Sequence, residues 1–220
     1  MTRTPRRPAR RSAATGVVLA VGLLLLVSGC TAPVGDADAQ LGTGRAEYRR
    51  GLVPPVPYAV PSVVLTDTSG AHYDVTTSPA TPVVLVFFGY TSCREVCPGV
   101  LGNLALALSR LPAGDRDRIT PVFVTTDPAR DTPGRIRAHL DRFDAGFVGL
   151  TGAPSATRSL AEAVGVQIEG RQDQPGGGYL VGHSAHVVGL DRDRRGVVVW
   201  DPETPVADLA HDLSLLVARA

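Results

Sequence analysis

The sequence predicts an α/β domain with a mixed central sheet flanked by helices and an N-terminal β-hairpin. Apolar, β-branched runs alternate with Leu/Ala-rich or amphipathic stretches, which is the pattern of strands alternating with helices. The last two apolar runs, joined by a short polar turn, predict an antiparallel pair. The 220 residues suit one domain plus appendages. Hydrophobic residues make up 44% and aromatic ones only 5%, so the core must be largely aliphatic.

The first 29 residues predict an export signal. Five arginines precede an apolar stretch at residues 17–27, which is too short to span a bilayer comfortably. Residues 27–30 are Val-Ser-Gly-Cys, which resembles a bacterial lipobox with Cys30 as the lipidated first residue of the mature chain. The alternative is an ordinary secretory signal with a chance cysteine, and the paired arginines leave a twin-arginine route open. We expect a lipid-anchored protein on the extracytoplasmic face of the cell membrane.

Residues 30–60 predict a flexible membrane tether, because they are rich in Ala, Gly, Pro and Asp without sustained periodicity. The globular domain is then expected over residues 61–220. Five of the 22 basic residues and none of the 21 acidic ones precede Cys30, which leaves 17 against 21 and a net charge of −4. The sequence shows no basic patch that would indicate nucleic-acid binding.

The elements of the domain follow from apolar runs and from turn and cap residues. They are, in order, a hairpin (63–65 and 72–75), a buried central strand (83–88), a helix (101–111), a strand (119–125), a helix starting at Pro133, a short strand (147–150), a helix (155–164), two strands (183–191 and 197–200) and a C-terminal helix (206–218).

Several local expectations accompany these elements. Thr132 is a good helix N-cap, and His139 is expected on the polar face of the helix that follows. Arg130 and Asp131 are expected to form a structural ion pair. Residues 167–178 are polar and end in three glycines, which predicts a mobile loop.

The chemistry is concentrated where the central strand meets the first helix. Cys93 and Cys97 lie there, and a helix N-terminus favours thiolates, which exchange with disulfides and bind soft metals. If Cys30 is acylated, these are the remaining cysteines, and a structural disulfide across so small a loop would stabilise little. Two thiols at this position of an α/β sandwich suggest a thioredoxin-like fold. However, thioredoxin-type sites have two residues between their cysteines, whereas this chain has three.

A metal site would need a third ligand from elsewhere in the chain. Residues four apart lie on one face of a helix, so Cys93 and Cys97 can act as two ligands. Imidazole suits copper and zinc, and His183, which follows an apolar strand and a glycine, is the best candidate. His186 is expected on the opposite face of the strand. His72 is expected to face solvent, and Tyr90 to lie in the core.

Three stretches, taken together and in order, resemble one known family. They are Phe-Phe-Gly-Tyr-Thr-Ser-Cys with the later Cys-Pro (87–98), Asp-Pro-Ala-Arg-Asp-Thr-Pro (127–133) and Tyr-Leu-Val-Gly-His-Ser (179–184). From about residue 60 to the C-terminus, the chain resembles the Sco/SenC proteins, which are thioredoxin-like copper-binding proteins of bacterial and mitochondrial membranes.

The resemblance implies copper, as Cu(I) or Cu(II), bound by Cys93, Cys97 and His183. It also implies assembly of the binuclear copper centre of cytochrome c oxidase, with subunit II or a similar cuproprotein as partner. Asp127 would lie beside the site by the same resemblance, although Asp-Pro is also an ordinary turn initiator.

Two departures and two alternatives accompany this resemblance. Pro and Asp usually follow the first thiol, but Arg94 and Glu95 stand there, and Arg94 is expected to lower a nearby thiol pKa. Gly182 replaces the Asp that usually precedes the site histidine. One alternative is a thiol–disulfide oxidoreductase that uses a Cys93–Cys97 redox disulfide to keep the subunit II cysteines reduced; the other is a thiol peroxidase. Copper binding requires His183, whereas disulfide exchange does not.

Overall fold

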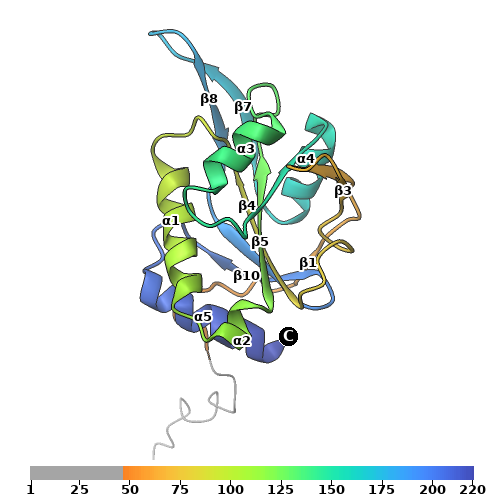
Figure 1. Cartoon of the computed structure of the whole chain (residues 1–220), viewed down its shortest axis with the longest axis vertical. Coiled ribbons are helices and arrows are strands. Elements are labelled where there is room, and N and C mark those ends of the chain that lie inside the picture. Colours follow the sequence, from red (N-terminus) through yellow and green to blue (C-terminus); the bar gives the residue numbers. More distant parts are fainter. Residues whose placement is uncertain (1–46) are drawn as a thin grey trace, which may run out of the picture. The chain divides into compact units, whose positions relative to one another are not determined.

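The computed structural model describes residues 47–220, and the expected signal peptide, Cys30 and the first part of the expected tether lie outside them. The described residues form an α/β unit (Figure 1). Its elements are β1 (Tyr58–Ala59), β2 (Leu65–Asp67), β3 (His72–Tyr73), β4 (Val83–Gly89), α1 (Val96–Ser109), α2 (Ala113–Arg116), β5 (Ile119–Thr125), α3 (Pro133–Leu140), β6 (Val148–Thr151), α4 (Pro154–Ala163), β7 (Ile168–Asp173), β8 (Tyr179–His183), β9 (Val187–Leu190), β10 (Arg195–Trp200) and α5 (Val206–Arg219). No helix within this part of the chain is long and apolar enough to cross a membrane.

Eight strands form a mixed sheet in the order β1-β10-β9-β4-β5-β6-β2-β3. The central strand β4 pairs in parallel with β5 and antiparallel with β9. All seven residues of β4 are buried, as the uninterrupted apolar run predicts. The hairpin β2–β3 and the pair β9–β10 are antiparallel. The predicted fold class, with its mixed sheet and N-terminal hairpin, is confirmed.

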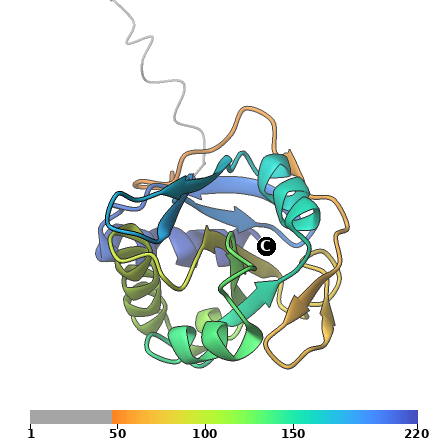
Figure 2. The ribbon, with the colours of Figure 1, turned by 90° about the horizontal axis from the view of Figure 1, so that it is seen from above.

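Helices cover both faces of the sheet (Figure 2). Successive residues of β4 point to opposite faces. Leu85 therefore packs in a core with residues of α1, α3 and α5, whereas Val86 packs in a second core with residues of α4. This sandwich fixes the end of β4, and with it the loop that leads to the first helix.

The expected boundary between tether and domain differs from the structure. Residues 47–60, here called the strap, pack against the unit. Leu52 forms a β-bridge with Val199, and β1 pairs with β10. The fully buried Asp212 carboxylate accepts backbone N–H groups of Arg49, Arg50 and Gly51. The proline-rich residues 54–57, the part of the stretch whose stiffness favours packing on the domain, are mostly exposed. The strap is held by backbone hydrogen bonds on either side of them rather than by a periodic apolar face.

The expectation of a mobile loop at residues 167–178 is wrong. Strand β7 occupies half of that stretch and pairs with β8 in a separate two-stranded sheet, here called the arm (residues 168–183). The arm projects from one end of the unit, and α5 lies at the opposite end (Figure 1). The stretch is polar because β7 is mostly exposed. The strand expected at 183–191 is also divided, since β8 ends at His183 and β9 lies in the main sheet.

Helix α3 confirms one local expectation and contradicts another. Thr132 caps it by accepting the Arg135 N–H at 3.3 Å. His139, however, is only 7% exposed rather than on a polar face, and its ring packs against Phe123 and Phe143. Burial accordingly lowers the pKa of His139. The imidazole ring has an apolar body, so it can fill a core position. The helical pattern alone did not identify this position as buried.

Candidate metal centre

The thiol loop begins where β4 ends at Gly89. A Cβ atom at this position would lie 2.9 Å from the Phe123 ring and 3.1 Å from Cys97 Sγ, closer than side chains normally approach. Glycine therefore leaves the space in which the Cys97 sulfur packs against the end of the central strand. Cys97 belongs to the first core cluster, and Cys93 packs against that cluster from a partly exposed position.

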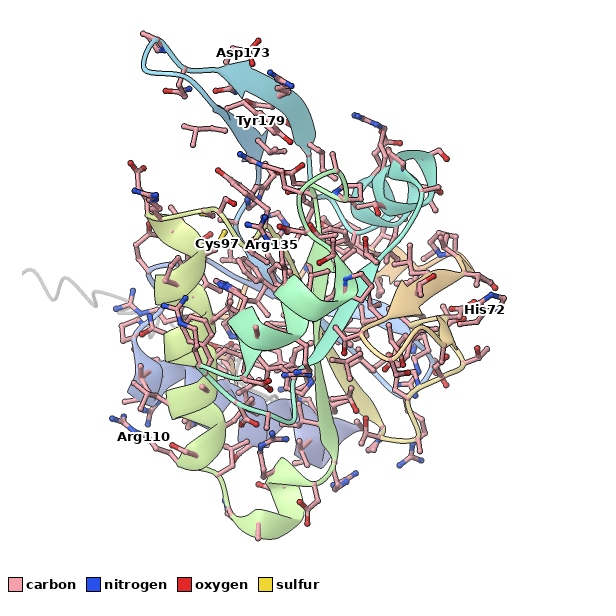
Figure 3. The ribbon with its side chains drawn as sticks, turned by 45° about the horizontal axis from the view of Figure 1, so that its top comes forward. His72, Cys97, Arg110, Arg135, Asp173 and Tyr179 are labelled. Carbon is pink, nitrogen blue, oxygen red and sulfur yellow. The ribbon has the colours of Figure 1, made fainter. Side chains whose placement is uncertain are left out.

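Both thiols are free and lie at the N-terminus of α1, as the sequence predicts. Figure 3 shows Cys97 at the start of this helix, facing the arm. The helix has no capping side chain at Glu95. Instead, Cys93 Sγ accepts the Cys97 N–H at 3.4 Å and so satisfies one of the free donors at the helix start.

The two sulfurs differ in protonation. A hydrogen bond from the Cys97 thiol is the main cause that lowers the pKa of Cys93, to about 5; burial opposes it, and backbone N–H groups of the first turn add to it. The same hydrogen bond and burial raise the pKa of Cys97. Arg94 is not among the main causes of the Cys93 shift, so the helix start and the second thiol lower this pKa. At neutral pH the pair holds one thiolate, on the more exposed sulfur.

His183 lies at the thiols, at the end of β8. Its Nε2 is 3.8 Å from Cys97 Sγ, and its Nδ1 lies 2.9 Å from the carbonyl oxygen of Ser184. A carbonyl can only accept, so Nδ1 carries the proton and Nε2 keeps its lone pair on the side of the sulfur. The ring of Tyr90 contacts the imidazole edge-to-face, with centroids 5.9 Å apart.

The residues present fit a soft metal ion. Metal–sulfur and metal–nitrogen bonds of about 2.3 and 2.0 Å at a trigonal angle place the two ligand atoms about 3.7 Å apart. The observed separation of 3.8 Å between Cys97 and His183 matches this value. Within residues 47–220, no three His, Cys, Asp or Glu side chains are already gathered around one ion position. Cys93 lies beside the Cys97–His183 pair, with its sulfur 3.4 Å from the backbone nitrogen of Cys97.

A groove of about 660 Å³ opens between the thiol loop and the arm. Cys93, Arg94 and His183 line it, together with the exposed side chains of Val96 and Leu180. The half-buried sulfur of Cys93 is therefore accessible to a partner from this side, whereas Cys97 is fully buried.

The second motif supports the site with two buried aspartates. Asp131 accepts the Thr91 N–H at 2.9 Å and the hydroxyls of Thr91 and Thr125, both at 2.6 Å, and so ties the thiol loop to the end of β5. Arg130 forms its ion pair with Asp127, so the expected Arg130–Asp131 pair is wrong. Asp127 also accepts the Tyr179 hydroxyl at 2.9 Å, which joins it to the arm.

Sequence reasoning missed three side chains around the site: Tyr90, Arg130 and Tyr179. Tyr90 is buried as expected, but its ring also contacts His183. The sequence did offer a signal for the two tyrosines, because both lie within the three family-like stretches. Tyr90 directly precedes Thr-Ser-Cys in the first stretch, and Tyr179 begins the third. A pattern of residue types does not show that these stretches meet in space.

The other histidines behave differently from His183. His72 is exposed on β3, as expected, far from the thiols (Figure 3). His186 lies in the link between β8 and β9 rather than in a strand, and burial lowers its pKa. At Gly182, a Cβ atom would meet the Glu169 carboxylate at 2.6 Å and the Gln172 amide at 2.7 Å. Side chains of β7 therefore fill the space beside Gly182.

The fold and these contacts define a thioredoxin-like protein in which a pair of thiols faces an imidazole. The family model described as SCO1/SenC matches residues 59–218. The chain therefore belongs to the SCO1/SenC family.

Individual relatives agree with this assignment. A Stutzerimonas stutzeri protein named for copper binding is 33% identical over 176 residues, which cover 79% of this chain and 84% of that protein. The mitochondrial SCO1 homolog 2 of Arabidopsis thaliana is 41% identical over 135 residues, or 61% of this chain and 49% of its own length. The chain thus spans only about half of that mitochondrial relative.

Two solved structures share the fold at appreciable identity. Bradyrhizobium japonicum ScoI with copper bound has a TM-score of 0.64 and 29% identity, covering 72% of this chain and 99% of that one. Apo Sco1 from Thermus thermophilus has a TM-score of 0.66 and 31% identity, covering 78% and 98%.

Proposed function

We propose that this protein is a membrane-anchored, extracytoplasmic copper chaperone for assembly of the binuclear copper centre of cytochrome c oxidase. It binds copper through Cys93, Cys97 and His183, and subunit II or a similar cuproprotein receives the metal. The observation that carries the proposal is the 3.8 Å approach of His183 Nε2 to Cys97 Sγ, made by residues 86 positions apart. The copper-bound structure of a relative and the naming of another for copper binding support it.

The ligand set suits copper as cargo. Thiolates favour Cu(I), and imidazole also supports Cu(II). The ionised and partly exposed Cys93 lies in the open groove, where a cysteine of the recipient can displace it. The buried Cys97 and the imidazole then hold the ion until the recipient has enough ligands to take it.

The test is copper titration of the reduced full-length chain in a Cys30→Ala background, so that the two site cysteines carry the only thiols. We expect one copper per chain, with two sulfurs and one nitrogen in its shell by X-ray absorption. His183→Ala should weaken binding, and Cys93→Ser or Cys97→Ser should abolish tight binding. A copper shell without sulfur would refute the proposal.

A second candidate, a thiol–disulfide oxidoreductase, is favoured by the asymmetry of the two thiols. The Cys93 thiolate would attack a partner disulfide, forming a mixed disulfide and releasing one partner thiolate. Cys97 would lose its proton and attack Cys93, which releases the second partner thiol and leaves a Cys93–Cys97 disulfide. The partner gains two electrons and this protein loses two, so an extracytoplasmic dithiol must reduce it again.

His183 separates the two candidates, because disulfide exchange has no required task for it. Oxidase activity is measured in cells that carry His183→Ala at matched protein level. The chaperone role predicts lost oxidase assembly with partial rescue by added copper. Normal oxidase activity at limiting copper would favour the oxidoreductase instead.

Anchoring is tested separately through Cys30, which lies outside the described residues. Mature wild-type protein should fractionate with membranes, and Cys30→Ala should impair lipidation. Diacylglycerol supplies two chains, enough for stable anchoring, whereas a single chain would be marginal. Unlipidated wild-type protein in the medium would show that the lipobox interpretation is wrong.

A further inference from the structure

The arm that carries His183 is not part of the main sheet. Among the described strands, β8 pairs with β7 alone, and neither strand joins the eight-stranded sheet. Side chains of β7 are mostly exposed, so the arm has little apolar packing beneath it. Apart from Ile168, which packs against the second core cluster, and the buried Val181, side-chain contacts with the body are what keep His183 within reach of the thiols.

A connected group of four side chains joins β8 to the body, and we call it the clasp: Tyr90, Asp127, Arg130 and Tyr179. At the other strand of the arm, Arg158 of α4 donates to the Ile168 carbonyl oxygen at 3.0 Å. The Tyr179 hydroxyl donates to Asp127 Oδ1 at 2.9 Å, and Arg130 Nη1 donates to the Tyr179 carbonyl oxygen at 3.0 Å. The guanidinium carbon lies 3.6 Å from the centroid of the Tyr179 ring. Asp127 pairs with Arg130 Nε and so orients the guanidinium. Arg130 therefore contacts both the backbone and the ring of one residue of β8.

A second series of contacts leads from Arg130 to the imidazole itself. The guanidinium carbon is 5.6 Å from the centroid of the Tyr90 ring. The same ring meets His183 edge-to-face, and its hydroxyl lies against the backbone of Val181. The clasp thus contacts β8 at residues 179, 181 and 183. Side chains of the body occupy this edge of β8, where a further strand would otherwise pair.

We propose that Arg130 and Tyr179 are positioning residues for the metal site. By docking the arm they keep His183 Nε2 beside Cys97 Sγ, although neither touches the ligand atoms. The consequence for copper rests on the proposed function, whereas the docking of the arm can be tested without any metal.

The first experiment measures amide hydrogen exchange in the reduced, metal-free, full-length chain. Arg130→Lys keeps the charge beside Asp127 but loses the planar fork, and Tyr179→Phe removes only the hydroxyl. Both should speed exchange in the peptide covering residues 179–183 about tenfold while the main sheet stays unchanged. Arg135→Lys, at an exposed position of α3, and Tyr73→Phe in β3 are matched controls that should change nothing there.

The second experiment measures Cu(I) affinity by competition with a chelator. Arg130→Lys should weaken binding about 10- to 100-fold, which is the usual effect of losing an outer support of a ligating histidine. In a His183→Ala background, the same change should have no further effect, because a positioning residue acts only through the ligand that it positions. A merely structural role would lower affinity equally in both backgrounds.

The two readouts fail in different ways. If the wild-type chain binds no copper, the proposed function is wrong, and hydrogen exchange alone then decides whether the clasp docks the arm. The positioning proposal is overturned by unchanged exchange at residues 179–183 in both variants. It is also overturned by faster exchange with unaltered copper affinity, or by an equal loss of affinity with and without His183.

Discussion

The strap and the arm are both peripheral segments attached to the body through a buried aspartate, and they are held in different ways. Asp212 accepts three backbone N–H groups of the strap, and also the Trp200 Nε1–H at 3.1 Å. The strap adds strand pairing through β1 and the bridge at Leu52. It is therefore integrated into the fold by backbone hydrogen bonds.

The arm is attached mainly by side chains instead. Asp127 accepts one tyrosine hydroxyl and pairs with Arg130, which in turn donates to one carbonyl of β8. Releasing the arm leaves few backbone groups without a hydrogen-bond partner. The free-energy cost of releasing the arm is therefore small compared with that of releasing the strap. The comparison indicates that more backbone hydrogen bonds hold the N-terminal strap than hold the arm that carries His183.

The largest effect is expected at Asp212. Asp212→Ala leaves several buried donors without an acceptor, each at a cost of about 1–3 kcal/mol, so the free energy of unfolding should fall by about 3–5 kcal/mol. Denaturant titration of the full-length chain measures it. Asp208→Asn is the control, because its contacts with Arg49 and Arg50 are 3.4 Å long and partly exposed, and it should cost less than about 1 kcal/mol. Equal losses in both variants would contradict the special role of Asp212.

The next effect concerns the two thiols. Cys93 should react with iodoacetamide more than tenfold faster than Cys97, because it is ionised and half-buried whereas Cys97 is protonated and fully buried. Since the pKa of Cys93 is about 5, its rate should be nearly constant between pH 6.5 and 8, where an ordinary thiol reacts faster with each pH step. Mass spectrometry of the reduced chain locates the label. A Cys93 rate that climbs tenfold per pH unit would contradict the lowered pKa.

A smaller, pH-dependent effect tests whether the charge of the Asp212 carboxylate holds the strap. Burial alone would raise its pKa, but hydrogen bonds from the strap backbone, together with one from His211, outweigh burial and lower it below the ordinary value of 3.8. Its contribution to stability is therefore complete about one pH unit above the unfolded-state pKa of 3.8, and it is lost as the pH falls through the lowered folded-state pKa. The difference in unfolding free energy between wild type and Asp212→Asn should shrink from pH 7 to pH 3. A difference that is constant over this range would show that the carboxylate charge is not what holds the strap.

The smallest effect on global stability is expected in the arm. Tyr179→Phe removes one hydrogen bond to a carboxylate at a partly exposed segment, so the free energy of unfolding should change by less than about 1 kcal/mol. The same denaturant titration measures it beside Asp212→Ala. A loss as large as that of Asp212→Ala would mean that the arm is as integral to the fold as the strap.

Sequence reasoning succeeded where the signal was local. The apolar run of β4, the cap at Thr132 and the placement of the thiols at a helix start all depend on neighbouring residues. It failed for β7, whose polar residues have the composition of a loop, and for His139, whose burial depends on Phe123 from another element. The partner of Arg130 was also misassigned, because adjacent opposite charges need not face each other.

The sequence by itself determined the α/β class, the buried central strand and the two cysteines at the start of the first helix, because periodicity and spacing act over a few residues. It also supplied His183 as the candidate third ligand. Only the tertiary structure decided that His183 meets Cys97, that Arg130 and Tyr179 dock the arm, and that Asp212 holds the strap. The residues in each of these contacts are separated by between 49 and 163 positions in the sequence. The packing of the whole chain decides which of such distant residues come into contact.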